Sequence, residues 1–140
     1  MAPADDPSIS DNIWILRGLK PTELEMDSRG DEVPARAAFK SHCLSAFRAD
    51  KASASDVFAA YPKATRIARL TAGDVRAANC IVQNEEPPTG HVGIYRRDNP
   101  GQRISGASAG IMAKRARLTT DVKRDEILLV ANMFGMRMRP

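Results

Sequence analysis

The stretch TRIARLTAGDVRAANCIVQ, residues 65–83, predicts two strands joined by a short helix. In residues 65–70, arginines alternate with apolar side chains, which favours a strand. Thr71 and Asp74 have the spacing of a helix capping box, in which each side chain bonds the backbone amide of the other residue. Asn79 suits the left-handed conformation that ends a helix, and the apolar run after it predicts the second strand. Short strands interrupted by short helices favour an α+β fold.

The segments on either side extend this pattern. Short apolar or alternating runs predict further strands at residues 12–17, 42–47 and 91–96. Serine-capped runs predict helices at residues 53–61 and 105–118. The polar residues 18–34 predict a long connection with one helical turn after Pro21, which Thr22 would cap. We therefore expect an α+β domain of short mixed or antiparallel strands, short helices and one longer late helix.

The length of 140 residues fits a single domain, because domains usually contain about 100–200 residues. Residues 1–10 carry Pro, Asp and Ser and little to bury, so we expect a flexible arm there. The α+β domain is expected over residues 11–134, with a mobile tail at 135–140. Within it, residues 125–134 fit a strand or a helix, because Ile and Val favour a strand whereas Glu, Leu and Ala favour a helix.

The composition is that of an ordinary globular protein, with 43% hydrophobic and 27% charged residues. The N-terminal residues have no signal-peptide pattern, and no apolar run is long enough to cross a bilayer. We therefore expect a cytoplasmic protein without a membrane partner. Cys43 and Cys80 lie outside any CxxC pair, and we expect both to be reduced thiols in the core. The histidines and cysteines lack the spacing of metal ligands, so we expect no metal and no cofactor.

Charge is distributed unevenly along the chain. Residues 1–35 contain eight acids and three bases, whereas residues 96–124 contain eight bases and two acids. A basic surface attracts polyanions by releasing their counterions. The candidates for partner or nucleic-acid binding are Arg96, Arg97, Arg103, Lys114, Arg115 and Arg117. Alternatively, the acidic segment neutralises this basic face, or the two pair between chains and form a homo-oligomer.

His91 is the strongest single candidate for chemistry. It begins a predicted strand and shares a strand face with Tyr95, where an imidazole can act as a general base or hold an anion. A dyad of Cys43 with His91 is sterically possible if their two strands lie together. No P-loop, GxGxxG or HExxH motif occurs. The GASAG run at residues 106–110 lacks the P-loop lysine and better fits close helix packing.

The chain also resembles a loose group of small uncharacterised bacterial proteins. The resemblance covers about residues 11–96 and lies in the order of short segments: Leu16-Arg17, Ala38-Phe39, Leu44-Ser45-Ala46-Phe47-Arg48, Leu70-Thr71-Ala72-Gly73-Asp74-Val75-Arg76 and His91-Val92-Gly93-Ile94. It implies a bacterial cytosolic origin and no particular activity. It also draws attention to Ser45, Arg48, Arg76 and His91, whereas the basic C-terminal third falls outside it.

Two functions from different classes follow. The first is a small binding module that docks on a protein or nucleic-acid partner through its basic C-terminal third. The alternative is an enzyme acting on a phosphorylated or nucleotide-like substrate. His91 would be its acid–base, and Arg48 or Arg76 would clamp the anion. Convergence of these three residues in one pocket is required by the enzyme hypothesis.

Overall fold

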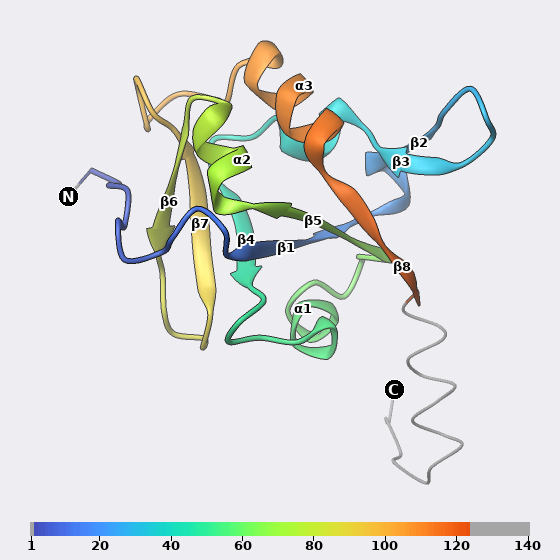
Figure 1. Cartoon of the computed structure of the whole chain (residues 1–140), viewed down its shortest axis with the longest axis horizontal. Helices are drawn as coiled ribbons and strands as arrows, with labels where there is room; N and C mark the ends of the chain where they lie inside the picture. Colours follow the sequence, from blue (N-terminus) through green and yellow to red (C-terminus); the bar gives the residue numbers. More distant parts are fainter. Residues whose placement is uncertain (1, 124–140) are drawn as a thin grey trace, which may run out of the picture.

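A computed structural model describes residues 2–123 (Figure 1). Six strands form one sheet in the order β6-β7-β4-β1-β5-β8, and every neighbouring pair is antiparallel. These strands are β1 (Trp14–Leu19), β4 (Leu44–Arg48), β5 (Arg66–Thr71), β6 (Cys80–Asn84), β7 (His91–Arg96) and β8 (Arg117–Lys123). The α+β fold class expected from the sequence is confirmed.

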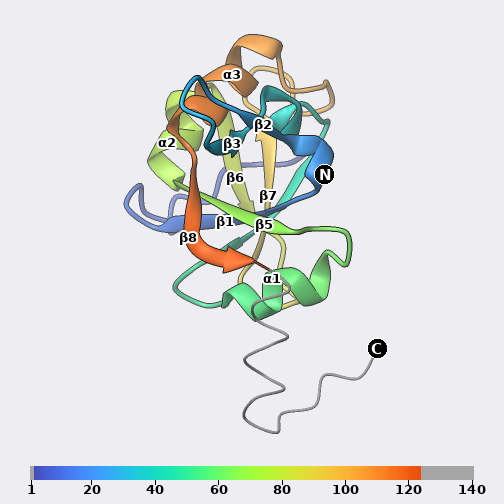
Figure 2. The same ribbon diagram turned by 90° about the vertical axis from the view of Figure 1, so that its right-hand side faces the viewer.

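Helices cover both faces of this sheet. One face packs against α2 (Ala72–Ala77), α3 (Gly106–Arg115) and the 3-10 turn η2 (Arg36–Phe39) around the larger hydrophobic core. The other face packs against α1 (Ala54–Ala60) around a smaller core that includes Phe47. Figure 2 shows α1 on the opposite side of the sheet from α2 and α3. The helices leave part of the second face, over β4, β7 and β6, open to polar side chains.

Local capping signals formed as the sequence predicts. Ser53 and Asp56 make a reciprocal capping box at the start of α1, and Thr71 and Asp74 make one at α2. Asn79 has a φ of 61° directly after α2, which is the left-handed conformation expected of it. These motifs depend only on residues a few positions apart, so the local sequence is enough to specify them.

The late helix is shorter than expected. The prediction extended it over residues 105–118, but α3 ends at Arg115 and the chain continues as β8. In β8, Arg117 and Leu118 lie opposite Arg69 and Ala68 of β5. Pairing with a distant strand therefore overrides the local helical preference of these residues. The prediction was wrong at this end of the helix.

The expected connection over residues 18–34 also contains more structure than predicted. A 3-10 turn, η1, does start at Pro21 and spans Pro21–Glu23, but its N-cap is Lys20 rather than Thr22. It is followed by a two-stranded hairpin of β2 (Leu24–Met26) and β3 (Glu32–Pro34). This hairpin projects from the domain in Figure 1.

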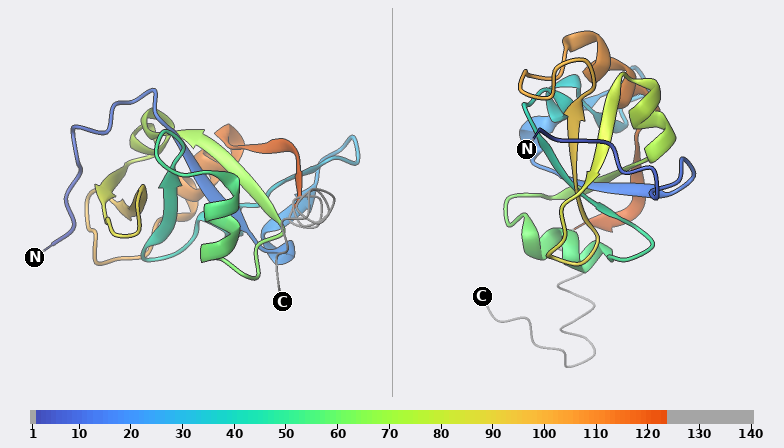
Figure 3. Two further views of the ribbon diagram at one scale, coloured as in Figure 1. Left: turned by 90° about the horizontal axis from the view of Figure 1, so that it is seen from below. Right: turned by 90° about the vertical axis from the view of Figure 1, so that its left-hand side faces the viewer.

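The N-terminal segment, expected as a flexible arm over residues 1–10, lies along β6 at one edge of the sheet (Figure 3). The amide of Asp6 donates to the carbonyl of Val82 at 2.8 Å, and Ile9 is fully buried. Arg76 on α2 donates to Asp5 and to Asp11. Contacts made by a few specific residues therefore attach this segment to the domain. The average composition of the segment does not reveal these contacts.

Two further expectations lie outside the described residues, namely the strand or helix at 125–134 and the tail at 135–140. Among residues 2–123, no helix is both long and apolar enough to cross a membrane.

Candidate functional site

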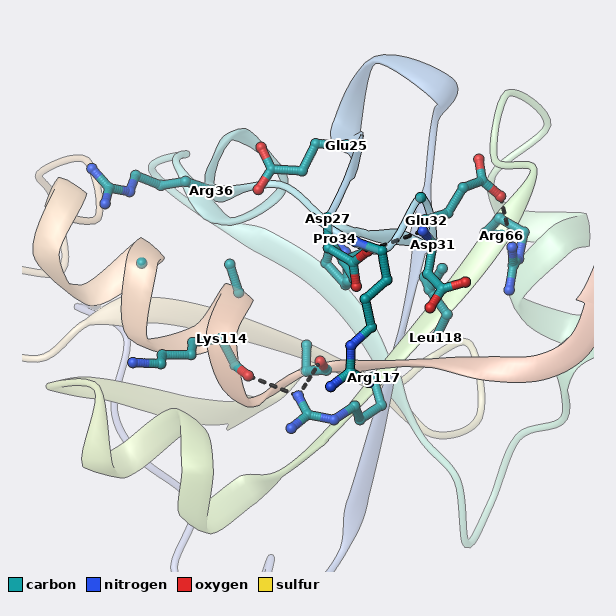
Figure 4. Close-up of a pocket in the computed structure, with 16 residues that line it drawn as sticks. Glu25, Asp27, Asp31, Glu32, Pro34, Arg36, Arg66, Lys114, Arg117 and Leu118 are labelled. Carbon is teal, nitrogen blue, oxygen red and sulfur yellow. Dashed lines mark hydrogen bonds and ion pairs between the residues drawn. The ribbon is translucent and has the colours of Figure 1, made fainter.

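A cavity of about 950 Å³ lies between the β2–β3 hairpin and the junction of α3 with β8. We call it the charged cleft. Its hairpin wall carries the acids Glu25, Asp27, Asp31 and Glu32 and one base, Arg29. Its basic side consists of Arg36, Arg66, Lys114 and Arg117. Figure 4 shows the hairpin carboxylates across the cleft from Lys114 and Arg117.

Some of these charges are already paired and others are not. Arg66 donates to Glu32 at 2.8 Å, which links β5 to the hairpin. The guanidinium of Arg117 donates to the carbonyls of Lys114 and Ala116. In the part of the chain that the structure describes, the side chains of Lys114 and Glu25 have no ion-pair partner. The cleft therefore presents available charge of both signs.

The structure divides the six basic residues singled out from the sequence. Only Lys114 and Arg117 line the cleft. Arg115 forms an ion pair with Asp74 of α2, at 3.1 Å. Arg96 pairs with Asp98, and its guanidinium also reaches the carbonyl of Arg103. Arg97 donates to the carbonyl of Cys80 at 3.0 Å, and Arg103 is exposed and does not line the cleft.

A second polar region lies on the open part of the sheet, where β4 and β7 pair. Ser45 lies opposite Gly93, and Phe47 lies opposite His91. Ser45 and His91 are therefore diagonal neighbours on one face, as the predicted strand alternation implies. The distance from Ser45 Oγ to His91 Nε2 is 3.0 Å. The other ring nitrogen, Nδ1, is 3.2 Å from the carbonyl oxygen of Glu85.

These contacts assign the tautomer of His91. A backbone carbonyl can only accept a hydrogen bond, so Nδ1 carries the proton and donates to Glu85. Nε2 is then the acceptor, and the Ser45 hydroxyl donates to it. The ring of Phe47 packs edge-on against the imidazole, with the centroids 5.3 Å apart. Both contacts hold the ring with its basic nitrogen aimed at Ser45.

The carboxylate of Glu85 lies directly above Gly93. A Cβ at position 93 would come within 2.6 Å of its carboxyl carbon, so only glycine leaves it room. The carboxylate accepts hydrogen bonds from the Tyr95 hydroxyl at 2.5 Å and from the Gln83 amide at 2.9 Å. We call Ser45, Glu85, His91 and Tyr95, together with Cys43 and Tyr61 at their border, the serine–histidine cluster.

Cys43 and Tyr61 border this group and are held neutral. Burial raises the pKa of the Cys43 thiol, and its hydrogen bond with Tyr95 offsets this only in part. Burial also raises the pKa of Tyr61, whose hydroxyl interacts with Ser45. Tyr95 has a raised pKa as well, because of burial and of the neighbouring Cys43 and Glu85. The hydroxyls and the thiol therefore remain protonated donors at neutral pH.

The structure connects His91 with Ser45, whereas the dyad weighed from the sequence joined His91 to Cys43. The hydrogen-bond partner of Cys43 is Tyr95. Nothing in the sequence indicated the role of Glu85. Strand alternation placed His91 and Tyr95 on one face, but the pairing of β4 with β7 that brings Ser45 beside His91 was not visible in the sequence.

Arg48 and Arg76 do not approach His91. Arg48 follows Phe47 in β4, so its side chain is on the opposite face of the sheet, where it binds Asp50. Arg76 binds Asp5, Asp11 and the carbonyl of Asp6 in the N-terminal segment. These contacts therefore do not bring His91, Arg48 and Arg76 together in the pocket that the enzyme hypothesis requires.

Within residues 2–123, no group of three or more histidine, cysteine or acidic side chains is arranged to hold a metal ion. The chain matches no protein-family model, no curated protein and no solved structure. Arguments about its function therefore depend on its own residues.

Proposed function

We propose that the protein is a binding module, and that its charged cleft docks a segment of a protein partner that carries both acidic and basic side chains. The observation that supports this proposal is the cavity of about 950 Å³, with carboxylates on one wall and Lys114 and Arg117 opposite them. A cavity of this size accommodates a short stretch of polypeptide. Such a partner would place its bases against the hairpin and its acids against α3 and β8.

Charge complementarity favours a protein over a nucleic acid. A nucleic acid offers only negative charge, so the carboxylates of the hairpin would repel it next to the bases that attract it. Several of the other bases are also occupied, such as Arg115 by Asp74 and Arg96 by Asp98. A purely basic ligand would instead be repelled by Lys114 and Arg117. A ligand with both signs avoids both penalties.

The proposal also includes a cytoplasmic location, where Cys43 and Cys80 stay reduced. Both cysteines are free in the structure, but Cys43 is exposed, so the prediction of a core thiol is wrong for this residue. Cys80 is buried, and burial raises its pKa to about 11. A thiol of this kind is a poor nucleophile for disulfide exchange at neutral pH.

The test uses fluorescence anisotropy with four labelled probes at low salt. These are a peptide with a lysine block and a glutamate block, an all-lysine peptide, an all-glutamate peptide and a single-stranded oligonucleotide. We expect the mixed peptide to bind most tightly. The double variant Lys114→Glu/Arg117→Glu should weaken it about tenfold, since exposed pairs contribute about 0.2–1 kcal/mol each. Glu25→Lys/Asp31→Lys should weaken it to a similar extent.

Lys63→Glu/Arg97→Glu is the matched control. Like Lys114→Glu/Arg117→Glu, it replaces two bases with two acids, at exposed residues that do not line the cleft. Equal losses in the control and in the cleft variants would show a general charge effect and refute the docking site. Tighter binding of the oligonucleotide than of the mixed peptide would refute the protein partner. Light scattering that shows salt-sensitive self-association through these residues would identify the partner as a second copy of the chain.

A further inference from the structure

A second site emerges from the open face of β4 and β7, independently of the charged cleft. Three features meet there. Ser45 is 3.0 Å from the unprotonated nitrogen of His91, the ring of His91 is oriented by a carbonyl, and a carboxylate is held above Gly93. A nucleophile within hydrogen-bond reach of a base, with that base oriented by a third group, is the common arrangement of covalent catalysis.

We propose that Ser45 and His91 are a nucleophile and general base that hydrolyse carboxylic esters with a neutral or positively charged acyl or alcohol group. This activity is additional to the docking function and does not depend on it.

The chemistry runs in two steps. Ser45 Oγ attacks the ester carbonyl carbon while its proton passes to His91 Nε2, and the resulting imidazolium then protonates the departing alcohol as the carbon–oxygen ester bond breaks. In the second step, a water molecule gives its proton to His91 and attacks the acyl carbon. The bond to Ser45 Oγ breaks, and the proton returns from His91 to Ser45. Atoms and charges balance, and no further reactant is required.

The neighbouring residues support this assignment of the nucleophile. Cys43 is the other nucleophilic side chain at this face, but its raised pKa keeps it as a thiol bound to Tyr95. The hydroxyl of Tyr61, the C-cap residue directly after α1, interacts with Ser45 from the same side of the sheet. It is the donor placed to stabilise the oxyanion that forms on the carbonyl oxygen.

The charge at the site indicates the substrate class. Glu85 is the charged side chain of this group, and its carboxylate is held on the open face by Tyr95 and Gln83. A carboxylate attracts a cationic substrate and repels an anionic one. The arginines that would have clamped a phosphate, Arg48 and Arg76, bind acids elsewhere. An ester with a neutral or cationic group fits this environment better than a phosphorylated one.

The test is covalent labelling with a fluorophosphonate, in which Ser45 Oγ bonds to phosphorus and fluoride leaves. We expect one adduct, located on Ser45 by mass spectrometry of the digested protein. Ser45→Ala should lose it. His91→Gln, which keeps a similar shape but offers no basic nitrogen, should lower the labelling rate about 10²–10⁴-fold. Ser10→Ala is the matched control, because Ser10 is exposed and hydrogen-bonds Asn12 instead of a base.

Circular dichroism on each variant confirms that it is folded. The proposal is overturned if the folded wild-type protein acquires no adduct on Ser45, or if His91→Gln is labelled as fast as wild type. Hydrolysis of p-nitrophenyl acetate and of a choline ester then tests the substrate class. Glu85→Gln should lower the choline-ester rate more than the acetate rate, so that the preference for the choline ester falls. An unchanged preference would refute the role of Glu85.

Discussion

The charged cleft and the serine–histidine cluster differ in the backbone that holds them. The acids of the cleft lie on a hairpin of two three-residue strands, which joins the domain through contacts such as Arg66 with Glu32. Ser45, His91 and Tyr95 of the serine–histidine cluster lie on β4 and β7, two interior strands of the six-stranded sheet. A short hairpin can adjust to a partner, whereas paired strands keep side chains in one arrangement. The first region suits docking, and the second suits chemistry that needs fixed distances.

Among the changes that test this comparison, Gly93→Ala is expected to have the largest effect, a loss of stability. The new methyl would lie 2.6 Å from the Glu85 carboxylate, so the carboxylate must leave its place above the sheet. We expect the variant to lose about 1–3 kcal/mol of unfolding free energy, as is typical of overpacked sites. Urea unfolding measures this loss, and mixed-peptide binding at the cleft should not change.

The matched control for that variant is Gly106→Ala. No atom lies within 4 Å of the Cβ that this change adds, and Gly106 is the first residue of α3. Its unfolding free energy should stay the same or rise slightly. If Gly93→Ala were as stable as Gly106→Ala, the packing of Glu85 above the sheet would not constrain the serine–histidine cluster.

A smaller effect is expected from salt, which should weaken binding at the charged cleft but not labelling at the serine–histidine cluster. The charges of the cleft are largely exposed, so added salt screens their attraction for a charged peptide. We expect the affinity for the mixed peptide to fall several-fold between low and high salt. Labelling of Ser45 by an uncharged fluorophosphonate should hardly change, because the probe carries no charge for salt to screen. Parallel salt titrations measure both, and equal sensitivity would contradict the division into two regions.

The smallest effect concerns the reactivity of Cys43. Burial raises its pKa above the ordinary value of a thiol, so at a given pH it contains less thiolate than an unstructured cysteine. In a Cys80→Ser background, iodoacetamide should modify Cys43 more slowly than it modifies a free cysteine peptide near pH 8, and the gap should close as the pH rises. Mass spectrometry over a pH series checks this. Faster modification than the peptide would mean that Cys43, rather than Ser45, is the activated nucleophile of the cluster.

Much of the local structure was predictable. The capping boxes of α1 and α2 and the left-handed Asn79 were all visible in the sequence, because each depends on residues within one turn of backbone. The strand alternation also placed Ser45 with Phe47, and His91 with Tyr95, on common faces. Strand β8 was missed, because its residues adopt this conformation only through pairing with β5. The hairpin was missed because its strands are too short for a period to show.

By itself, the sequence determined the α+β class, the helix starts and the faces of the strands, since these follow from propensity and from periods of a few residues. Only the tertiary structure decided which strands pair, and with that the two sites. Ser45 and His91 meet because β4 pairs with β7 in one particular register, and the acidic and basic segments meet because the hairpin lies beside β8. Contacts between residues so far apart in the chain depend on the packing of the whole domain, which no local pattern encodes.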